Sequence, residues 1–160
     1  METKFIERFD NKRNEIKEAL TFLLDTCKDD INYSDIVHIV IDAIHEDDGD
    51  PNPNTIHEID DGDYQGTLLF VIPEDLYQPY DYWYVRVEYG SCSCCDTLEG
   101  IFYGSDNREQ QIDDLFTLAL HILHIVSLII LFVYIFYNIC HNYFLQMVPN
   151  VLGKLLLHHM

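Results

Sequence analysis

The chain has 160 residues and a strongly acidic composition, with a formal net charge of −19 at pH 7. Residues 1–114 contain all 28 acidic residues and eight of the nine basic ones, a formal charge of −20 that disfavours binding to nucleic acid or to an anionic lipid surface. A protein partner with a basic surface, or a divalent cation, would be attracted instead, although most acidic runs simply form a solvated surface.

The start of the chain does not resemble a secretory signal peptide, because charged and apolar residues alternate over the first twenty positions. The five cysteines are therefore expected to be reduced, as in the cytosol. Their odd number and uneven spacing also disfavour a disulfide framework.

Two helices are expected before residue 46. The segment 4–27 carries apolar residues at helical spacing, with charged residues between them. A second helix is expected to begin at Ser34, whose hydroxyl can cap the first turn, and Asp35 favours the positive end of the helix dipole. Its broad apolar face predicts a position deep in the core for Ile36, Val37, Val40, Ile41 and Ile44.

The acidic loop 46–54, with the sequence EDDGDPNPN, ends the second helix because its prolines and glycine hold no regular element. Two strand signals follow. Residues 67–72 form a continuous apolar run, and residues 82–89 alternate in character, which together predict an antiparallel pair joined by a long loop. On the second strand, Tyr82, Tyr84 and Arg86 are expected to share one face, opposite Trp83, Val85, Val87 and Tyr89.

A third helix is expected to start near Asn107 and to lose its polar face as it proceeds. No Asp, Glu, Lys or Arg occurs between positions 115 and 153. A helix over 118–139 would be about 33 Å long, enough to cross roughly 30 Å of hydrocarbon.

The domain organisation predicted from this pattern has three parts. Residues 1–114 form an acidic soluble domain. Residues 115–145 form a hydrophobic segment that enters the lipid bilayer through a transmembrane helix at about 118–139, and residues 146–160 form a short tail. With no signal peptide and reduced cysteines, the expected product is a single-pass membrane protein whose N-terminal domain lies in the cytosol.

The strongest chemical signal is the cysteine-rich turn after the second strand. Cys92, Cys94 and Cys95 could bind zinc, with His57 or Asp96 as the fourth ligand. Their C-x-C-C spacing differs from the C-x₂-C of common zinc turns, and a tight turn of small residues explains it equally well. No histidine is spaced to select a catalytic dyad, and no phosphate-binding or hydrolase motif occurs. The sequence therefore favours a protein without catalytic residues, and zinc is the one cofactor left open.

Five segments form a common pattern: 61–68, 72–79, 80–84, 89–98 and 113–121. Together they resemble a family of uncharacterised proteins from phages and large DNA viruses. The resemblance covers about residues 30–121 and implies a viral context but no established activity. Position 94 is cysteine here, where the family pattern looks like glycine, so Cys92 and Cys95 would be the family's C-x₂-C pair. The family's closing helix is not expected to continue into a membrane segment after His121.

The sequence as a whole predicts an α+β fold. The acidic domain is expected to contain two N-terminal helices, an antiparallel strand pair or small sheet, and a third helix that continues into the transmembrane helix. One function left open is a non-enzymatic, membrane-anchored accessory or interaction protein that meets a partner through its acidic face and Tyr82, Tyr84 and Arg86. The other is a small zinc-binding or thiol-redox module at Cys92 and Cys95.

Overall fold

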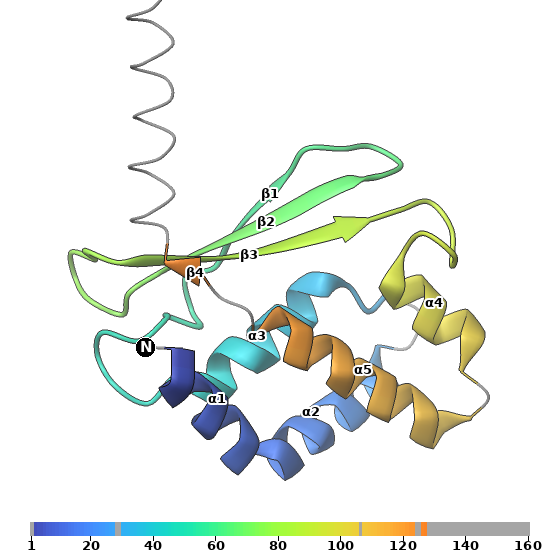
Figure 1. The fold of residues 1–160 in the computed structure, drawn as a ribbon, viewed down its shortest axis with the longest axis horizontal. Helices are drawn as coiled ribbons and strands as arrows, with labels where there is room; N and C mark the ends of the chain where they lie inside the picture. The colour runs from blue at the N-terminus through green and yellow to red at the C-terminus, as the bar shows by residue number, and fades with distance from the viewer. Residues whose placement is uncertain (1, 28–29, 106, 124–125, 128–160) are drawn as a thin grey trace, which may run out of the picture. The chain divides into compact units, whose positions relative to one another are not determined.

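Helices pack against one face of an antiparallel sheet, so the predicted α+β class is confirmed (Figure 1). The computed structural model describes residues 2–27, 30–105, 107–123 and 126–127, and Met1–Val126 form one compact unit. The described elements, in chain order, are α1 (Glu2–Asn11), α2 (Arg13–Thr26), α3 (Tyr33–Ile44), β1 (His57–Asp60), β2 (Gly66–Pro73), β3 (Tyr82–Tyr89), α4 (Thr97–Gly104), α5 (Arg108–Ile122) and the two-residue β4 (Val126–Ser127).

The first segment forms two helices, α1 and α2, where the sequence predicts a single helix over 4–27. Between them the backbone of Lys12 leaves helical values, with φ −98° and ψ 16°. Before this bend, α1 packs Phe9 against Phe116 of α5, with ring centroids 5.4 Å apart. No proline or glycine lies at the break. Tertiary packing therefore decides it, because the apolar periodicity continues through the bend.

Helix α3 forms the centre of the core, as predicted, but it begins one residue earlier than expected. Its N-cap is Asn32, whose side chain accepts from the backbone N–H of Asp35 at 3.1 Å, while the Asp35 carboxylate accepts from the backbone N–H of Asn32 at 2.9 Å. This reciprocal capping box satisfies two backbone donors at once, a role that the sequence assigns to Ser34 instead. The apolar face is fully buried, with 0% exposure at Ile36, Val37, Val40, Ile41 and Ile44.

The predicted strand pair is confirmed, and β1 extends it to three main strands. Strands β2 and β3 pair antiparallel over their whole length, and β4 follows β3 in the sheet order β1–β2–β3–β4. Strand β1 pairs antiparallel with β2, with His57 opposite Val71 and Asp60 opposite Leu68. All four side chains of β1 are exposed. The strand therefore lacks the alternation of apolar and polar residues that reveals a strand in a sequence.

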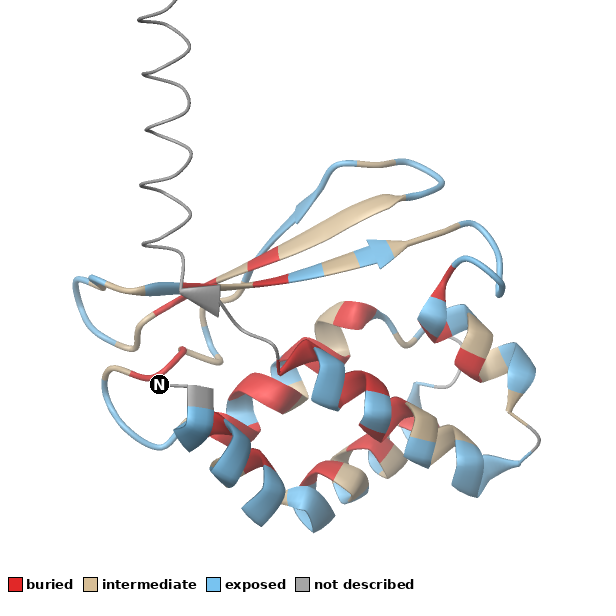
Figure 2. Cartoon of the chain, viewed as in Figure 1, coloured by how far each residue is buried: buried red, intermediate tan, exposed pale blue. Residues whose placement is uncertain are grey.

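The two faces of the sheet differ in what covers them (Figure 2). The inner face packs on the helices, and Phe70, Ile72, Trp83 and Val85 on it are at most 3% exposed. The outer face carries the alternate side chains, and no described helix packs on it. We use the name outer face for the side chains of Ile59, Leu69, Val71, Tyr82, Tyr84 and Arg86.

The acidic loop 46–54 contains a buried carboxylate and is not only a solvated run of charge. Asp50 is fully buried and accepts from Lys4 Nζ and Arg8 Nη1 of α1, each at 2.5 Å. Two backbone N–H groups of the same loop also donate to it. Burial by itself would raise the pKa of Asp50, but the hydrogen bonds from Lys4 and Arg8 lower that pKa to about 2. Asp50 thus joins the loop to the first helix.

Helix α5 begins as predicted but ends earlier. Asn107 is its N-cap and accepts from the backbone N–H of Gln110 at 3.0 Å. The sequence predicts a helix that continues through residue 139, whereas α5 ends at Ile122 and is followed by the short β4. Leu118 and Ile122, at the start of the predicted span, are 7% and 3% exposed because they pack in the core of the domain.

Most of the predicted transmembrane segment lies outside the described residues. Residues 124–125 and 128–160 belong to that part of the chain. Within the described ranges, no helix combines the length and the apolar composition needed to cross a bilayer.

Candidate functional site

The cysteine-rich turn joins β3 to α4 and places its thiols at the surface. The backbone N–H groups of Cys95 and Asp96 both donate to the Cys92 carbonyl at 2.9 Å, which closes the turn. Cys92, Cys94 and Cys95 are exposed and free. Gly90 is required next to them, because a Cβ at this position would lie 2.6 Å from Cys95 Sγ.

Cys92 and Cys95 interact with each other within this turn. A hydrogen bond between the two side chains lowers the pKa of Cys92 and raises the pKa of Cys95. The Cys95 thiol also donates to the Cys92 carbonyl, with an S···O distance of 3.3 Å. Cys92 is therefore more thiolate-like at neutral pH than an ordinary exposed cysteine, and the thiolate is the reactive form.

The structure does not bring His57 to these thiols. Strand pairing places His57 opposite Val71, whereas the cysteine turn follows Tyr89 at the other end of the β2–β3 pair. Among the described residues, no group of three or more His, Cys, Asp or Glu side chains is arranged to hold a metal ion. Cys92 and Cys95 are thus placed together as two thiols, and the histidine named with them from the sequence lies elsewhere.

Asp96 is the buried centre of the same turn, at 7% exposure. It accepts hydrogen bonds from Tyr33 Oη at 3.1 Å and from the backbone N–H groups of Gly90 and Glu99 at 3.2 and 3.0 Å. Tyr33 Oη in turn accepts from the backbone N–H of Leu98 at 3.1 Å. Burial of the ring, together with the neighbouring Asp96, raises the pKa of Tyr33 to about 12. The Asp96–Tyr33 pair therefore links the turn to the start of α3.

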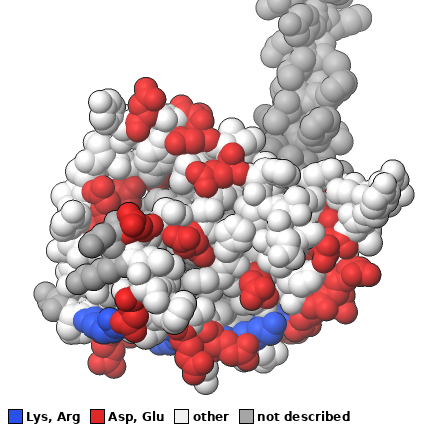
Figure 3. All heavy atoms as spheres, turned by 180° about the vertical axis from the view of Figure 1, so that it is seen from behind, with Lys and Arg blue, Asp and Glu red and all other residues white. Residues whose placement is uncertain are grey.

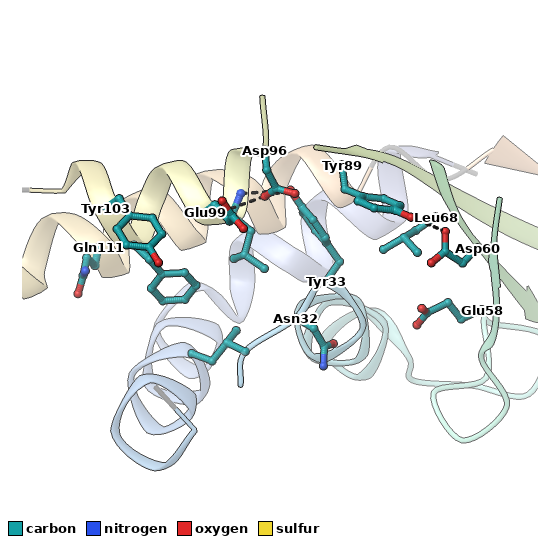
Figure 4. Close-up of a pocket in the computed structure, with 13 residues that line it drawn as sticks. Asn32, Tyr33, Glu58, Asp60, Leu68, Tyr89, Asp96, Glu99, Tyr103 and Gln111 are labelled. Carbon is teal, nitrogen blue, oxygen red and sulfur yellow. Dashed lines mark hydrogen bonds between the residues drawn. The ribbon is translucent and has the colours of Figure 1, made fainter. Parts of the chain in front are cut away.

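Beside this pair lies an open pocket of about 830 Å³, which we call the acidic pocket. Figure 4 shows its two sides: Glu58 and Asp60 project from β1, while Glu99 and Tyr103 project from α4. Tyr33 and Asp96 lie between them. Tyr89 Oη donates to Asp60 Oδ1 at 2.7 Å, and this hydrogen bond raises the pKa of Tyr89 to about 12. The pocket thus combines carboxylates with aromatic rings.

The charge in the acidic pocket is of one sign. Four of the thirteen described residues that line the pocket are carboxylates, and none of the thirteen is a lysine or an arginine. Basic side chains elsewhere are largely used within the fold: Arg13, Lys17 and Arg108, for example, pair with Asp10, Asp113 and Asp25. On the face shown in Figure 3, acidic side chains are spread over the surface and the few basic ones lie along one side.

The predicted interaction residues lie together on the outer face. Tyr82 is 38% exposed, Tyr84 is half-buried, and the Arg86 side chain pairs with Glu88 at 2.8 Å. The strand register adds apolar neighbours that the sequence pattern does not reveal. Val71 lies directly opposite Tyr84, and Leu69 lies opposite Arg86. The outer face therefore combines tyrosine and apolar side chains with the Arg86–Glu88 ion pair and His57.

Two local signals in the sequence would have revealed the elements around the acidic pocket. Asp96 is followed three residues later by Glu99, and Asn32 is followed three residues later by Asp35. An N-cap residue with an acidic residue at the third helical position is typical of a helix start. The first pattern predicts α4, and the second predicts the true start of α3. The contact of Tyr33 with Asp96 spans 63 positions and has no local signal.

Comparison with known proteins identifies no relative. No protein-family model matches the chain. A search of curated proteins and a search of solved structures each find no match.

Proposed function

We propose that the chain is a non-enzymatic, membrane-anchored interaction or accessory protein whose folded domain meets a protein partner through the outer face. The observation that carries the proposal is the uncovered outer face, which exposes Ile59 and Tyr82 by 53% and 38%. A one-sided sheet normally presents polar residues on its solvated face, whereas a tyrosine and apolar surface is typical of a protein interface.

The chemistry of the outer face supports a protein partner. Tyr82 and Tyr84 each present a large ring together with a hydroxyl, so they can gain contact area and a hydrogen bond at low cost in conformational entropy. Leu69 and Val71 add apolar area beside them. The acidic surface of the domain favours a partner that carries basic side chains around this contact.

Site-specific photo-crosslinking on the full-length chain tests the outer face. A crosslinker at Tyr84 is expected to capture a defined partner, and Tyr82→Ala together with L69A is expected to abolish that capture. The matched control places the crosslinker at Tyr77, which is fully exposed in the loop between β2 and β3. Equal capture from both positions, or capture that survives the double substitution, would contradict the proposal.

The membrane anchor in this proposal rests on composition. Positions 115–153 carry no Asp, Glu, Lys or Arg, and a stretch of this length without charge favours insertion into a bilayer. Carbonate extraction of membranes from cells that express the full-length chain tests it. The protein should stay in the membrane pellet, and recovery in the carbonate supernatant would refute the anchor.

A second candidate function is a thiol-redox or zinc-binding module at Cys92 and Cys95. The observation that favours it is the direct interaction of the two exposed thiols, which lowers the pKa of Cys92. With glutathione disulfide as oxidant, the two thiols would form one disulfide, and both protons and both electrons would pass to two released glutathione thiols. Zinc would require two further ligands besides these two thiols.

Alkylation kinetics and elemental analysis separate these possibilities. Under limiting iodoacetamide, mass spectrometry should find Cys92 modified faster than Cys94, with Cys27 as an exposed internal reference. Glutathione disulfide should remove two hydrogens from the wild-type chain but not from the Cys92→Ser variant. Stoichiometric zinc in the purified full-length chain would favour the metal form of the module, and equal alkylation rates without disulfide formation would exclude the redox form.

A further inference from the structure

The cysteine turn holds two thiols close together at the surface of the domain. Its backbone is a β-turn, closed by the hydrogen bond from the N–H of Cys95 to the carbonyl of Cys92 at 2.9 Å. The first and last Cα atoms of such a turn lie less than about 7 Å apart. The Cys95 thiol donates to the Cys92 carbonyl, with an S···O distance of 3.3 Å, and both side chains are exposed. The two thiols are therefore within reach of one small ligand.

The turn that carries these thiols is fixed to the core of the domain. Asp96, the next residue, is buried and accepts from Tyr33 Oη and from the backbone N–H of Gly90. Gly90 packs directly on the thiol of Cys95, since a Cβ at this position would lie 2.6 Å from Cys95 Sγ. The fold itself thus orders the two thiols, and a ligand that binds them does not have to order the segment.

The number of ligands in this turn decides which metal it suits. Within the described ranges no third His, Cys, Asp or Glu side chain joins the pair in an arrangement that could hold a metal ion. Zinc in a structural site takes four protein ligands, so two thiols leave its coordination half complete. Cu(I) is a soft ion that thiolates select, and two thiolates suffice to coordinate it. The pair therefore matches Cu(I) better than zinc.

We propose that Cys92 and Cys95 form a binding site for Cu(I). On binding, two Cu–S bonds form, the two S–H protons pass to solvent, and the copper keeps its oxidation state. Cys92 loses its proton first, because the Cys95 side chain and backbone groups of the turn lower the pKa of Cys92. The site rests on the same two thiols as the second candidate function, and it names a metal whose coordination those thiols complete.

Competition with bicinchoninate, a chelator whose Cu(I) complex is coloured, tests the site. The full-length chain is titrated in non-ionic detergent, without oxygen and with ascorbate present to keep the copper monovalent. The wild-type chain should remove a single copper ion per chain from the coloured complex. Cys92→Ser and C95S should each bind Cu(I) about 100-fold more weakly, because the second thiolate of a chelating pair binds in an intramolecular step.

Matched serine variants locate the binding to this pair of thiols. Cys27→Ser is the control, because Cys27 is also exposed and free but lies at the end of α2. Cys94→Ser makes the same change inside the turn. Both variants should bind Cu(I) as the wild-type chain does, and X-ray absorption of the copper-loaded chain should show two sulfur ligands. All four cysteines are exposed, and circular dichroism verifies that each variant folds.

Three results would overturn the Cu(I) site: no removal of copper from bicinchoninate, a loss in C27S or C94S as large as that in C92S, or displacement of the copper by excess zinc. Each would leave the redox form of the second candidate function standing if Cys92 is still alkylated faster than Cys94. Conversely, equal alkylation rates without disulfide formation would exclude the redox form but not Cu(I) binding. The outer face is unchanged in every variant, so neither result affects the proposed partner contact.

Discussion

Asp50 and Asp96 are both buried carboxylates in turns that join a helix to the sheet, yet their surroundings differ. Asp50 accepts from two cationic side chains, Lys4 and Arg8 of α1. Asp96 accepts from neutral donors, Tyr33 Oη and two backbone N–H groups. Positive charges therefore stabilise the buried Asp50 carboxylate, whereas hydrogen bonds from neutral groups alone stabilise that of Asp96.

This difference shows how a strongly acidic chain uses individual acids. Most of its 28 acidic residues are solvated, and only Asp50 and Asp96 are buried among the described residues. Asp50 attaches the acidic loop to the domain and makes the fold sensitive to acid. Asp96 attaches the cysteine turn to α3 and forms the base of the acidic pocket. Asp50 therefore stabilises the fold, whereas Asp96 also holds the residues of a candidate site in place.

Removing the charge of Asp50 is expected to have the largest effect on stability. Asp50→Asn leaves Arg8, which is 13% exposed, without its buried counter-charge and should lower the free energy of unfolding by about 3 kcal/mol. Urea unfolding of the full-length chain, followed by the fluorescence of its single tryptophan, Trp83, measures this loss. The exposed Asp48→Asn serves as control and should change stability by about 0.5 kcal/mol or less. Similar losses in both variants would contradict the structural role of Asp50.

The same ion network predicts loss of stability in acid. The pKa of Asp50 is about 2 in the folded chain against 3.8 unfolded, so its contribution is complete above about pH 5. It falls as the carboxyl protonates between pH 4 and pH 2, by about 2 kcal/mol in total. Urea unfolding at several pH values should show this component in the wild-type chain and not in Asp50→Asn. Identical pH slopes in the two chains would refute it.

Disrupting the neutral partner of Asp96 should cost less. Tyr33→Phe removes the hydroxyl that donates to Asp96 and accepts from Leu98, and should lower the free energy of unfolding by about 1.5 kcal/mol. A double-mutant cycle with Asp96→Asn separates the pair from its other contacts, because the two losses should not add. Additive losses would mean that the hydroxyl and the carboxylate act independently.

The smallest effect is expected at the exposed end of the Asp50 network. Lys4 is 45% exposed, so K4M removes a partly screened charge and keeps much of the aliphatic chain. A decrease of about 0.5 kcal/mol or less in the free energy of unfolding would show that Arg8, rather than Lys4, is the main counter-charge of Asp50. A loss as large as that of Asp50→Asn would instead give Lys4 the principal role.

Much of the fold could be predicted from the sequence, because the main elements carry strong local patterns. The apolar face of α3 and the alternation of β3 both lead to the observed burial. The break at Lys12 and the exposed strand β1 could not, since neither has a local signal. Residues 57–60 form strand β1 because their backbone pairs with the edge of β2. Their four side chains are all exposed and give no sign of a strand.

The candidate sites divide in the same way. The sequence placed Tyr82, Tyr84 and Arg86 on one face because strand geometry alternates side chains without reference to the rest of the fold. It also singled out Cys92 and Cys95, whose spacing is local. It could not place His57 relative to the thiols, because that requires the register of β1.

The sequence alone determined the charge, the α+β class, the central helix α3 and the shared face of Tyr82, Tyr84 and Arg86 on β3. Each of these follows from composition or from residues close together in the sequence. The burial of Asp50, the contact of Tyr33 with Asp96 and the acidic pocket were decided by the tertiary structure alone. The contact of Arg8 with Asp50 spans 42 positions, and that of Tyr33 with Asp96 spans 63. At such separations the packing of the fold decides the environment of a side chain, and the residues next to it in the sequence do not predict that environment.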